Sequence, residues 1–274
     1  GTDVSEGVKN VAIGNQSLSR ATDDSSHNVA VGFQSLNGNF TDADVDECVA
    51  IGSFAVGDGT LTTTASGTTA VGYKALTANT SGAGNIAIGF EAGKTISSSS
   101  KNTVMGYQAL NTMATGNGAN TAVGYKAMTV LANGGNDNTA IGSNAMLVAN
   151  HDDASQNVAV GSQSGKTLTQ GQKNTFVGNE AASTVLTTGD KNTIIGSEST
   201  TSSSGAENQI SLGQGITGQA DDTAIIGNSD VTDVYMAQDK GAKVHCSTVI
   251  GSFGNVAGVS GGTAAWTGAL GHRI

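Results

Sequence analysis

Five aromatic residues occupy one position of a repeated sequence unit, directly after its glycine, and they are the first candidates for chemistry. They are Phe33, Tyr73, Phe90, Tyr107 and Tyr125. If the units stack, the rings form a column that could bind sugars by stacking, or that could fill a groove between units or subunits. In other units the same position is serine: Ser53, Ser143 and Ser162. We take this column, together with the only tryptophan, Trp266, as the candidate ligand contacts.

Two acidic loop segments carry oxygen ligands of the kind that calcium prefers. One runs through Asp42, Asp44, Asp46 and Glu47, and the other is His151-Asp152-Asp153. Neither has the fixed D-x-D-x-D-G loop or the glycine-rich nonapeptide of known calcium sites, so we interpret both as solvated loops. The four histidines are far apart in the sequence: His27, His151, His245 and His272. In a trimer, a threefold axis could bring three copies of any one of them together. The sequence predicts no metal and no cofactor.

The sequence contains no recognisable enzyme motif. Glycine triplets are expected by chance in a chain with 40 glycines, and none follows a strand and opens a helix as phosphate-binding loops do. Carboxylate pairs for glycoside hydrolysis meet through folding, so sequence spacing does not test for them. Most of the loops are short, whereas a catalytic cleft usually needs bulky walls. We therefore predict that the chain is not an enzyme.

Charge and composition narrow the class of partner. The formal net charge is -10, which argues against a nucleic-acid-binding face because such a face needs clustered lysine and arginine. No apolar run approaches the roughly 20 residues of a membrane-spanning helix, and residues 1–3 do not resemble a signal peptide. The two cysteines, Cys48 and Cys246, show no disulfide framework. We expect neither nucleic-acid binding nor membrane insertion.

The elements that position these residues are set by an internal repeat. The segment N-(V/I/T)-A-(I/V)-G recurs with glycines 14 to 20 residues apart, about 18 on average. Degenerate copies end at Gly52, Gly72, Gly106, Gly178, Gly196, Gly213 and Gly227. The six clear copies carry the structural pairs Asn10 and Gly14, Asn28 and Gly32, Asn85 and Gly89, Asn120 and Gly124, Asn138 and Gly142, and Asn157 and Gly161.

The repeat predicts an all-β chain that winds into a parallel β-solenoid, or β-roll, of about 12 to 13 coils. The first five positions alternate β-branched and small residues, which is typical of a strand and, we expect, of one buried on both faces. A helix does not fit, because the central glycine and the flanking loops leave fewer than about 12 consecutive positions. One short unit cannot bury its apolar side alone, so neighbouring coils must stack and pair their backbones.

Stacking gives each repeat position a structural role. The β-branched residue before the glycine forms a continuous apolar ladder, and the preceding alanine points the other way. The glycine provides a bend or bulge between two short strands, since other residues resist such dihedral angles. The asparagine four places before the glycine either stacks as an amide ladder or hydrogen-bonds the turn backbone.

These units resemble the head repeats of trimeric autotransporter adhesins, which form a left-handed parallel β-roll. The extended forms Gly72–Leu76 and Gly124–Met128 are similar to repeats in bacteriophage tail fibres, as is the tract Ile226–Met236. The resemblance covers about residues 8 to 227. It implies a homotrimeric fibre at the virion tail, outside the cell, with a host-surface glycan or protein and other virion tail proteins as partners.

The repeat length favours the tail fibre, because adhesin-head repeats are usually shorter than 18 residues and no adhesin stalk or anchor is evident. The alternatives are the head of a bacterial cell-surface adhesin and a polysaccharide-degrading tailspike. Trimerisation has an independent argument, since a thin roll with apolar strand faces would expose more apolar surface than soluble monomers tolerate. Identical rods that associate would cover it.

Two regions are expected along the chain. Residues 1–227 form the β-roll, and residues 228–274 form a C-terminal capping or transition segment with strands at 231–236 and 243–250. The rings of the aromatic column and Trp266 are the candidate receptor contacts. Loops at 37–47, 57–67 and 147–156 are long, polar and free of the repeat, so they are further candidates for receptor contact.

Overall fold

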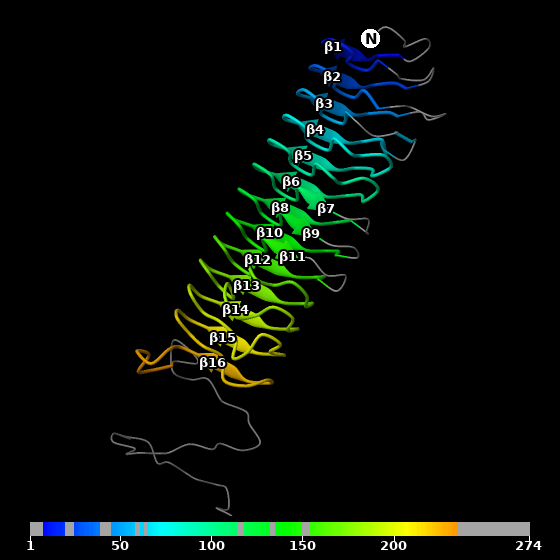
Figure 1. Cartoon of the computed structure of the whole chain (residues 1–274). Coiled ribbons are helices and arrows are strands. Elements are labelled where there is room, and N and C mark those ends of the chain that lie inside the picture. Colours follow the sequence, from blue (N-terminus) through cyan, green and yellow to red (C-terminus); the bar gives the residue numbers. More distant parts are fainter. Residues whose placement is uncertain are drawn as a thin grey trace, which may run out of the picture. The chain divides into compact units, whose positions relative to one another are not determined.

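The chain forms a parallel β-solenoid, described here from a computed structural model (Figure 1). The structure describes residues 8–19, 25–38, 45–57, 61–62, 65–113, 118–131, 135–149 and 154–234. The chain divides into two compact units, residues 1–232 and 233–274, and nearly all of the second lies outside the described residues. No α-helix occurs in the described part, which confirms the predicted all-β class.

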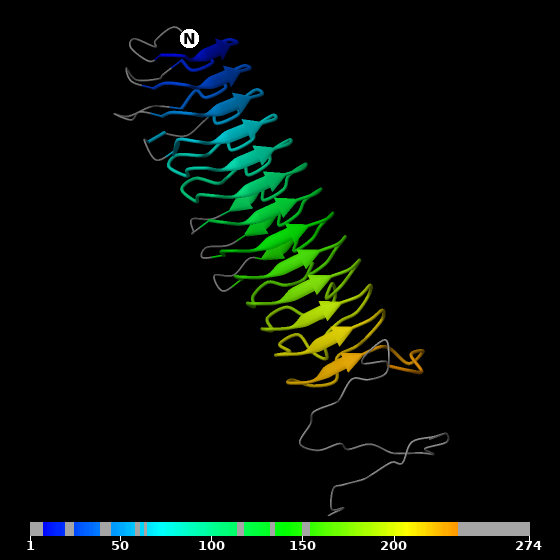
Figure 2. The same cartoon turned by 180° about the vertical axis from the view of Figure 1, so that it is seen from behind.

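One 13-stranded parallel sheet runs the length of the solenoid, in agreement with the 12 to 13 coils expected. Figures 1 and 2 show its strands one above another, each from a successive coil. The strands are β1 (Val11–Ile13), β2 (Val29–Val31), β3 (Val49–Ile51), β4 (Thr69–Val71), β5 (Ile86–Ile88), β6 (Thr103–Met105), β8 (Thr121–Val123), β10 (Thr139–Ile141), β12 (Val158–Val160), β13 (Thr175–Val177), β14 (Thr193–Ile195), β15 (Ile210–Leu212) and β16 (Ala224–Ile226).

The register of this sheet aligns equivalent repeat positions. Ala122 lies opposite Ala140, which lies opposite Ala159, and the flanking positions pair in the same way. A smaller parallel sheet joins three consecutive coils through β7 (Thr112–Met113), β9 (Val130–Leu131) and β11 (Val148–Ala149). Like positions therefore become columns, as the repeat predicted.

The expectation of strands buried on both faces is wrong. Each strand is only three residues long, and in nearly every coil its middle residue is buried while the first and third face outward. The core is lined by the middle alanines on one side and by residues of the following turn, such as Ala127 and Met128, on the other. Because the roll is this thin, each strand has one interior face.

A single large ring enters the core where two substitutions occur together. Phe176 replaces the usual alanine in the middle of β13 and is fully buried. The preceding coil has Gly165 where several other coils have leucine or methionine, and a Cβ there would lie 2.8 Å from Phe176 Cδ2. The missing side chain of one coil thus makes room for the ring of the next.

The repeated glycine permits the close approach of successive coils. Gly142 has φ +137°, and a Cβ on it would clash with the carbonyl oxygen of Gly161 in the next coil. The predicted bend is present, but the chain continues into a turn rather than directly into a second strand. Among the described coils, a short second strand follows that turn only at β7, β9 and β11.

The two roles suggested for the repeat asparagine occur together. In Asn138, Oδ1 accepts from the backbone N–H of Asn157 at 3.0 Å and from its Nδ2 at 3.1 Å. Its Nδ2 donates to Asn120 Oδ1 at 3.2 Å and to the carbonyl of Ala154 at 2.7 Å. Every hydrogen-bonding atom of this buried amide is therefore satisfied, partly by the ladder and partly by the turn backbone. Cys48 and Thr68 interrupt the ladder.

The segment after the solenoid differs from its prediction. Residues 231–234 are not in a strand, although a strand was expected at 231–236. The predicted strand at 243–250 lies outside the described residues, as do Trp266, His245 and His272.

Replacing Asn138 by alanine should lower the free energy of unfolding by about 2–4 kcal/mol, because buried backbone and amide groups of Asn120, Ala154 and Asn157 lose partners. The control is Asn144→Ala in the same coil. Among the described residues its amide bonds only to Ser143, so the change should cost about 1 kcal/mol, mainly because alanine resists the left-handed backbone at φ 54°. Urea denaturation followed by circular dichroism measures both. Equal losses would show that the ladder carries no special stability.

Replacing Gly142 by alanine should cost about 3 kcal/mol or more, since the new Cβ is strained at positive φ and meets the backbone of the next coil. The matched control is Gly67→Ala, where φ is +70° and no atom lies within 4 Å of the added Cβ. The control should lose only about 1–2 kcal/mol, the cost of left-handed backbone for alanine. The same denaturation measurement compares them, and a milder effect at Gly142 would contradict the close-approach explanation.

Candidate binding surface of the solenoid

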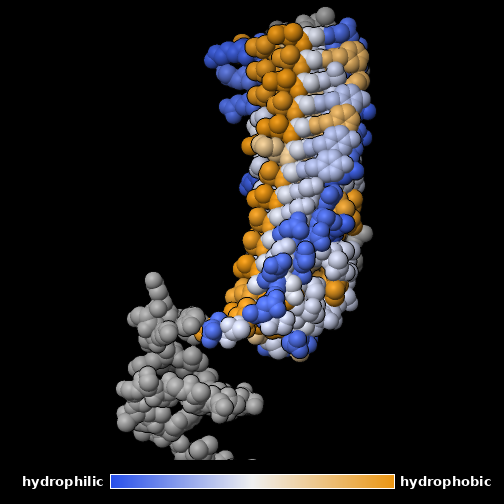
Figure 3. All heavy atoms as spheres, turned by 90° about the vertical axis from the view of Figure 1, so that its left-hand side faces the viewer, coloured by the Kyte–Doolittle hydropathy of each residue, from blue (hydrophilic) through white to orange (hydrophobic). Residues whose placement is uncertain are grey.

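An apolar ladder follows the outer face of the 13-stranded sheet. The last residue of every strand contributes to it, and Ile141 and Ile195 are 40% and 41% exposed. Figure 3 shows the stripe running along the stack. Its members are Ile13, Val31, Ile51, Val71, Ile88, Met105, Val123, Ile141, Val160, Val177, Ile195, Leu212 and Ile226. All thirteen are hydrophobic, so this face is unusually apolar for a surface that water reaches.

The aromatic column predicted from the sequence is confirmed as a geometric feature. Its rings lie on the far side of the glycine column from the ladder, each 40–50% exposed, and those from Tyr73 to Tyr125 stand in successive coils. The ring centroids of Tyr73 and Phe90 are 5.3 Å apart, those of Phe90 and Tyr107 5.2 Å, and those of Tyr107 and Tyr125 5.5 Å.

A sixth ring, Phe54, completes the column and was missed by sequence reasoning. It lies edge-on between Phe33 at 5.3 Å and Tyr73 at 6.2 Å. In its coil Ser53 follows the glycine, and the ring is one residue later. The signal that could have found it is an aromatic residue next to the expected position, in the one coil of this run that lacks one there.

The orientation of the rings decides which part of them a ligand meets. Phe90 is inclined by 24° to Tyr73 and by 8° to Tyr107, and Tyr107 is inclined by 11° to Tyr125. Near-parallel rings at these distances are offset-stacked. The faces of the inner rings lie against neighbouring rings, so the column presents mainly ring edges to solvent. This arrangement does not favour stacking of sugar rings on aromatic faces.

Charged and amide side chains border the column. Lys74 Nζ lies 5.3 Å from the centroid of Tyr73, and Lys126 Nζ lies 5.4 Å from that of Tyr125. Between them, Glu91 pairs with Lys94 at 2.9 Å and accepts from Gln108 Nε2 at 2.9 Å. The hydrogen bond from Lys94, followed by that from Gln108, lowers the pKa of the Glu91 carboxyl.

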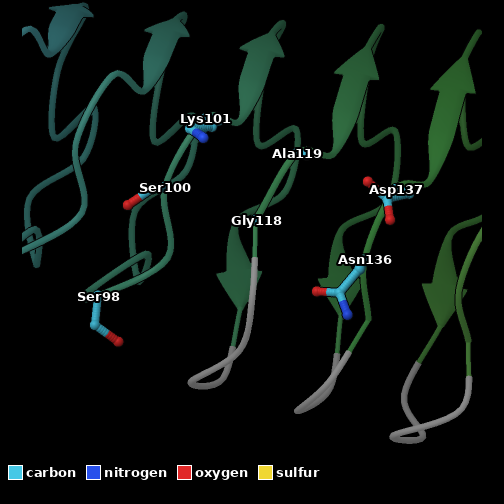
Figure 4. A pocket seen from close by; sticks show the side chains of 7 residues that line it. All are labelled: Ser98, Ser100, Lys101, Gly118, Ala119, Asn136 and Asp137. Carbon is cyan, nitrogen blue, oxygen red and sulfur yellow. The ribbon is translucent and has the colours of Figure 1, made fainter.

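A shallow hollow of about 410 Å³ lies on the opposite turn of three coils (Figure 4). Gly118 and Ala119 form its floor, because these small residues stand where the neighbouring coils carry larger polar pairs. The buried Oδ1 of Asn136 has no hydrogen-bond partner among the described residues. The walls are Ser98, Ser100, Lys101, Asn136 and Asp137. The lining is mostly polar and carries one cation, Lys101, and one anion, Asp137.

The acidic loops are only partly covered by the structure. Asp42, Asp44, His151, Asp152 and Asp153 lie outside the described residues, as do residues 39–44, 58–60, 63–64 and 150–153 of the candidate loops. Asp46 has a structural role, since its Oδ1 accepts from the backbone N–H of Ser26 at 2.6 Å. Within the described ranges, no group of three or more His, Cys, Asp or Glu side chains could hold a metal ion. The described part also contains no helix suited to crossing a membrane.

Comparison with known proteins adds no relative. The chain matches no protein-family model and no curated protein. Its function must therefore be inferred from the chemistry of its own exposed residues.

The one described cysteine is unsuited to nucleophilic chemistry. Cys48 is buried in the asparagine ladder, with Sγ 3.5 Å from the carbonyl oxygens of Asp46 and Ala65. Burial raises the pKa of the Cys48 thiol to about 11. The thiolate, which is the reactive form, is therefore disfavoured at neutral pH.

Because the folded state holds the Cys48 proton more tightly than the unfolded chain, the free energy of unfolding should fall as pH rises from the ordinary thiol pKa of 9.0 towards 11. Below pH 9.0 this contribution is fully present. Denaturation at several pH values measures it, with Cys48→Ala as the control that lacks the thiol. Parallel pH profiles for the two proteins would contradict the raised pKa.

Proposed function

We propose that this chain is a structural fibre segment that assembles as a homotrimer and adheres to a host surface, as in a phage tail fibre. The observation that supports assembly most strongly is the apolar ladder along all thirteen strands, of whose members seven are exposed and six are half-buried. An apolar stripe of this length marks an interaction surface. A second copy of the same chain carries the same stripe, so association of identical chains would bury it. The number three follows the resemblance of the repeats to trimeric fibres and adhesin heads.

The proposed role in adhesion rests on the exposed aromatic column. Its rings lie outside the core of the roll, where they are available to a binding partner. Aromatic residues are enriched at binding interfaces because they bury large areas and retain few conformations. In the proposed fibre, the partners are a host-surface glycan or protein and the other proteins of the virion tail. The location is the virion tail fibre, outside the cell.

The head of a bacterial cell-surface adhesin is the second candidate, since the same repeat occurs there and the same apolar face would serve its assembly. A polysaccharide-degrading tailspike is the third. That function would need two carboxylates facing one groove, about 5–9.5 Å apart. Oligosaccharide release from host polysaccharide would favour it over a binding-only fibre.

Charges placed on the ladder should prevent assembly. Ile141→Asp combined with Ile195→Asp puts two carboxylates per chain on the face that the copies would share, where desolvation and mutual repulsion oppose contact. Light scattering should give about three times 27.0 kDa for the unmodified chain and 27.0 kDa for this variant.

The matched control adds the same charge beyond the glycine column, through Gln163→Glu and Asn179→Asp, and should stay trimeric. Circular dichroism checks that each variant keeps its fold. A monomeric unmodified chain at micromolar concentration, or an assembled ladder variant, would count against the proposed trimer.

A further inference from the structure

The two halves of the solenoid share one face and differ in another. The apolar ladder continues through all thirteen strands, whereas the aromatic column spans only the coils of β2 to β8. Beyond Tyr125 the position after the glycine holds Ser143, Ser162, Asn179 and Ser197. If the ladder alone supports assembly in the second half, the aromatic column of the first half is not required for assembly and must serve something else.

The distribution of rings supports a separate role. Of the seven aromatic side chains among the described residues, six stand in the column and only Phe176 is in the core. The core is filled instead by alanine, leucine, isoleucine and methionine. Aromatic residues make up only 4% of the chain, and nearly all of the described ones lie in one exposed strip. Rings in that strip stabilise the roll less than buried rings would.

The strip differs in charge from the rest of the molecule. The turns that carry it hold three lysines, Lys74, Lys94 and Lys126, and one acid, Glu91, for a local balance of 3 - 1 = +2. The whole chain carries -10. The corresponding turns beyond Tyr125 contain one lysine, Lys166, and two glutamates, Glu180 and Glu198. The positive balance coincides with the rings.

The exposed groups of the strip are donors and positive edges. Stacked rings turn their edges outward, and the edge of an aromatic ring carries the positive part of its quadrupole. The hydroxyls of Tyr73, Tyr107 and Tyr125 make no hydrogen bond with the described residues, so they can bind a ligand. The ammonium groups of Lys74 and Lys126 lie beside these rings. Such a strip attracts oxygen-rich anions better than the apolar faces of neutral sugars.

We propose that the column from Phe33 to Tyr125, with Lys74 and Lys126, binds an acidic polysaccharide laid along the fibre. Rings repeat about every coil, so the ligand must itself be extended and periodic, with carboxylate groups that meet the ammonium and phenol groups. This inference rests on the proposed adhesive function and names its ligand class. In the proposed binding mode, ring edges and lysine ammonium groups contact anionic sugars, whereas the sequence suggested that sugars stack on ring faces.

The test uses the full chain and two labelled probes of equal length, alginate oligosaccharide as the acidic polymer and dextran oligosaccharide as the neutral one. Fluorescence anisotropy should show binding of alginate, weakening as salt rises, and no binding of dextran. Phe90→Ser with Tyr107→Ser should weaken alginate binding by about tenfold or more, and serine at this position is already tolerated in later coils.

Lys74→Ala with Lys126→Ala should weaken alginate binding to a similar extent. The control pair is Lys173→Ala with Lys191→Ala, which removes the same charge from a different face. All four lysines have φ between 52° and 59°, so the backbone cost of alanine is matched. The control pair should bind alginate as the unmodified chain does.

Equal binding of dextran, no binding of alginate, or equal weakening by the control pair would overturn the proposal. Light scattering of the same samples separates it from the proposed assembly. Column variants that lose the trimer would show that the rings belong to the subunit interface and would also overturn it. If the unmodified chain is monomeric but still binds alginate through the column, the proposed trimer is contradicted and the proposed binding site is supported.

Discussion

The structure depends on one constraint, the stacking of each coil on the next with no offset in register. Two buried features impose it. The repeated glycines bring backbone so close to backbone that a single Cβ would clash, as Gly142 shows against Gly161. The asparagine ladder then fixes the vertical match, since each amide finds all its partners only when the next asparagine lies directly above. A shift of one residue would leave buried polar groups unsatisfied in every coil.

That constraint explains why the core is built from small side chains and the exterior carries the large ones. Three-residue strands around a thin interior leave room for alanine and one longer aliphatic residue per coil, apart from the Phe176 and Gly165 exchange. The β-branched residues at the strand ends cannot enter and form the ladder outside. The same thinness that makes the roll simple to repeat thus leaves a hydrophobic face that association would cover.

A columnar architecture also lets separate faces evolve separately. The ladder and the aromatic column form separate strips on either side of the glycine column, whereas the polar hollow near Gly118 and Ala119 is formed by residues that precede the strands. A change in one column leaves the others in place, because the register is set inside the roll. The switch from rings to serine after Tyr125, with an unbroken ladder, shows this independence within one chain.

The sequence by itself determined the solenoid, its number of coils and its columns, because an 18-residue repeat with fixed asparagine and glycine can satisfy its backbone only by stacking. Only the tertiary structure decided which way each column faces and how its side chains meet. Leu36, Lys74 and Met128 adopt left-handed backbone that their residue types resist, since hydrogen bonds from neighbouring coils, such as Lys74 N–H to the Ser53 carbonyl at 3.0 Å, outweigh local preference. Phe54 also has left-handed backbone, at φ 60°, and its N–H donates to the carbonyl of Phe33 in the preceding coil at 2.9 Å. Whether a ring offers its face or its edge depends on the ring one coil away, which lies about 18 residues distant in the chain and leaves no local signal.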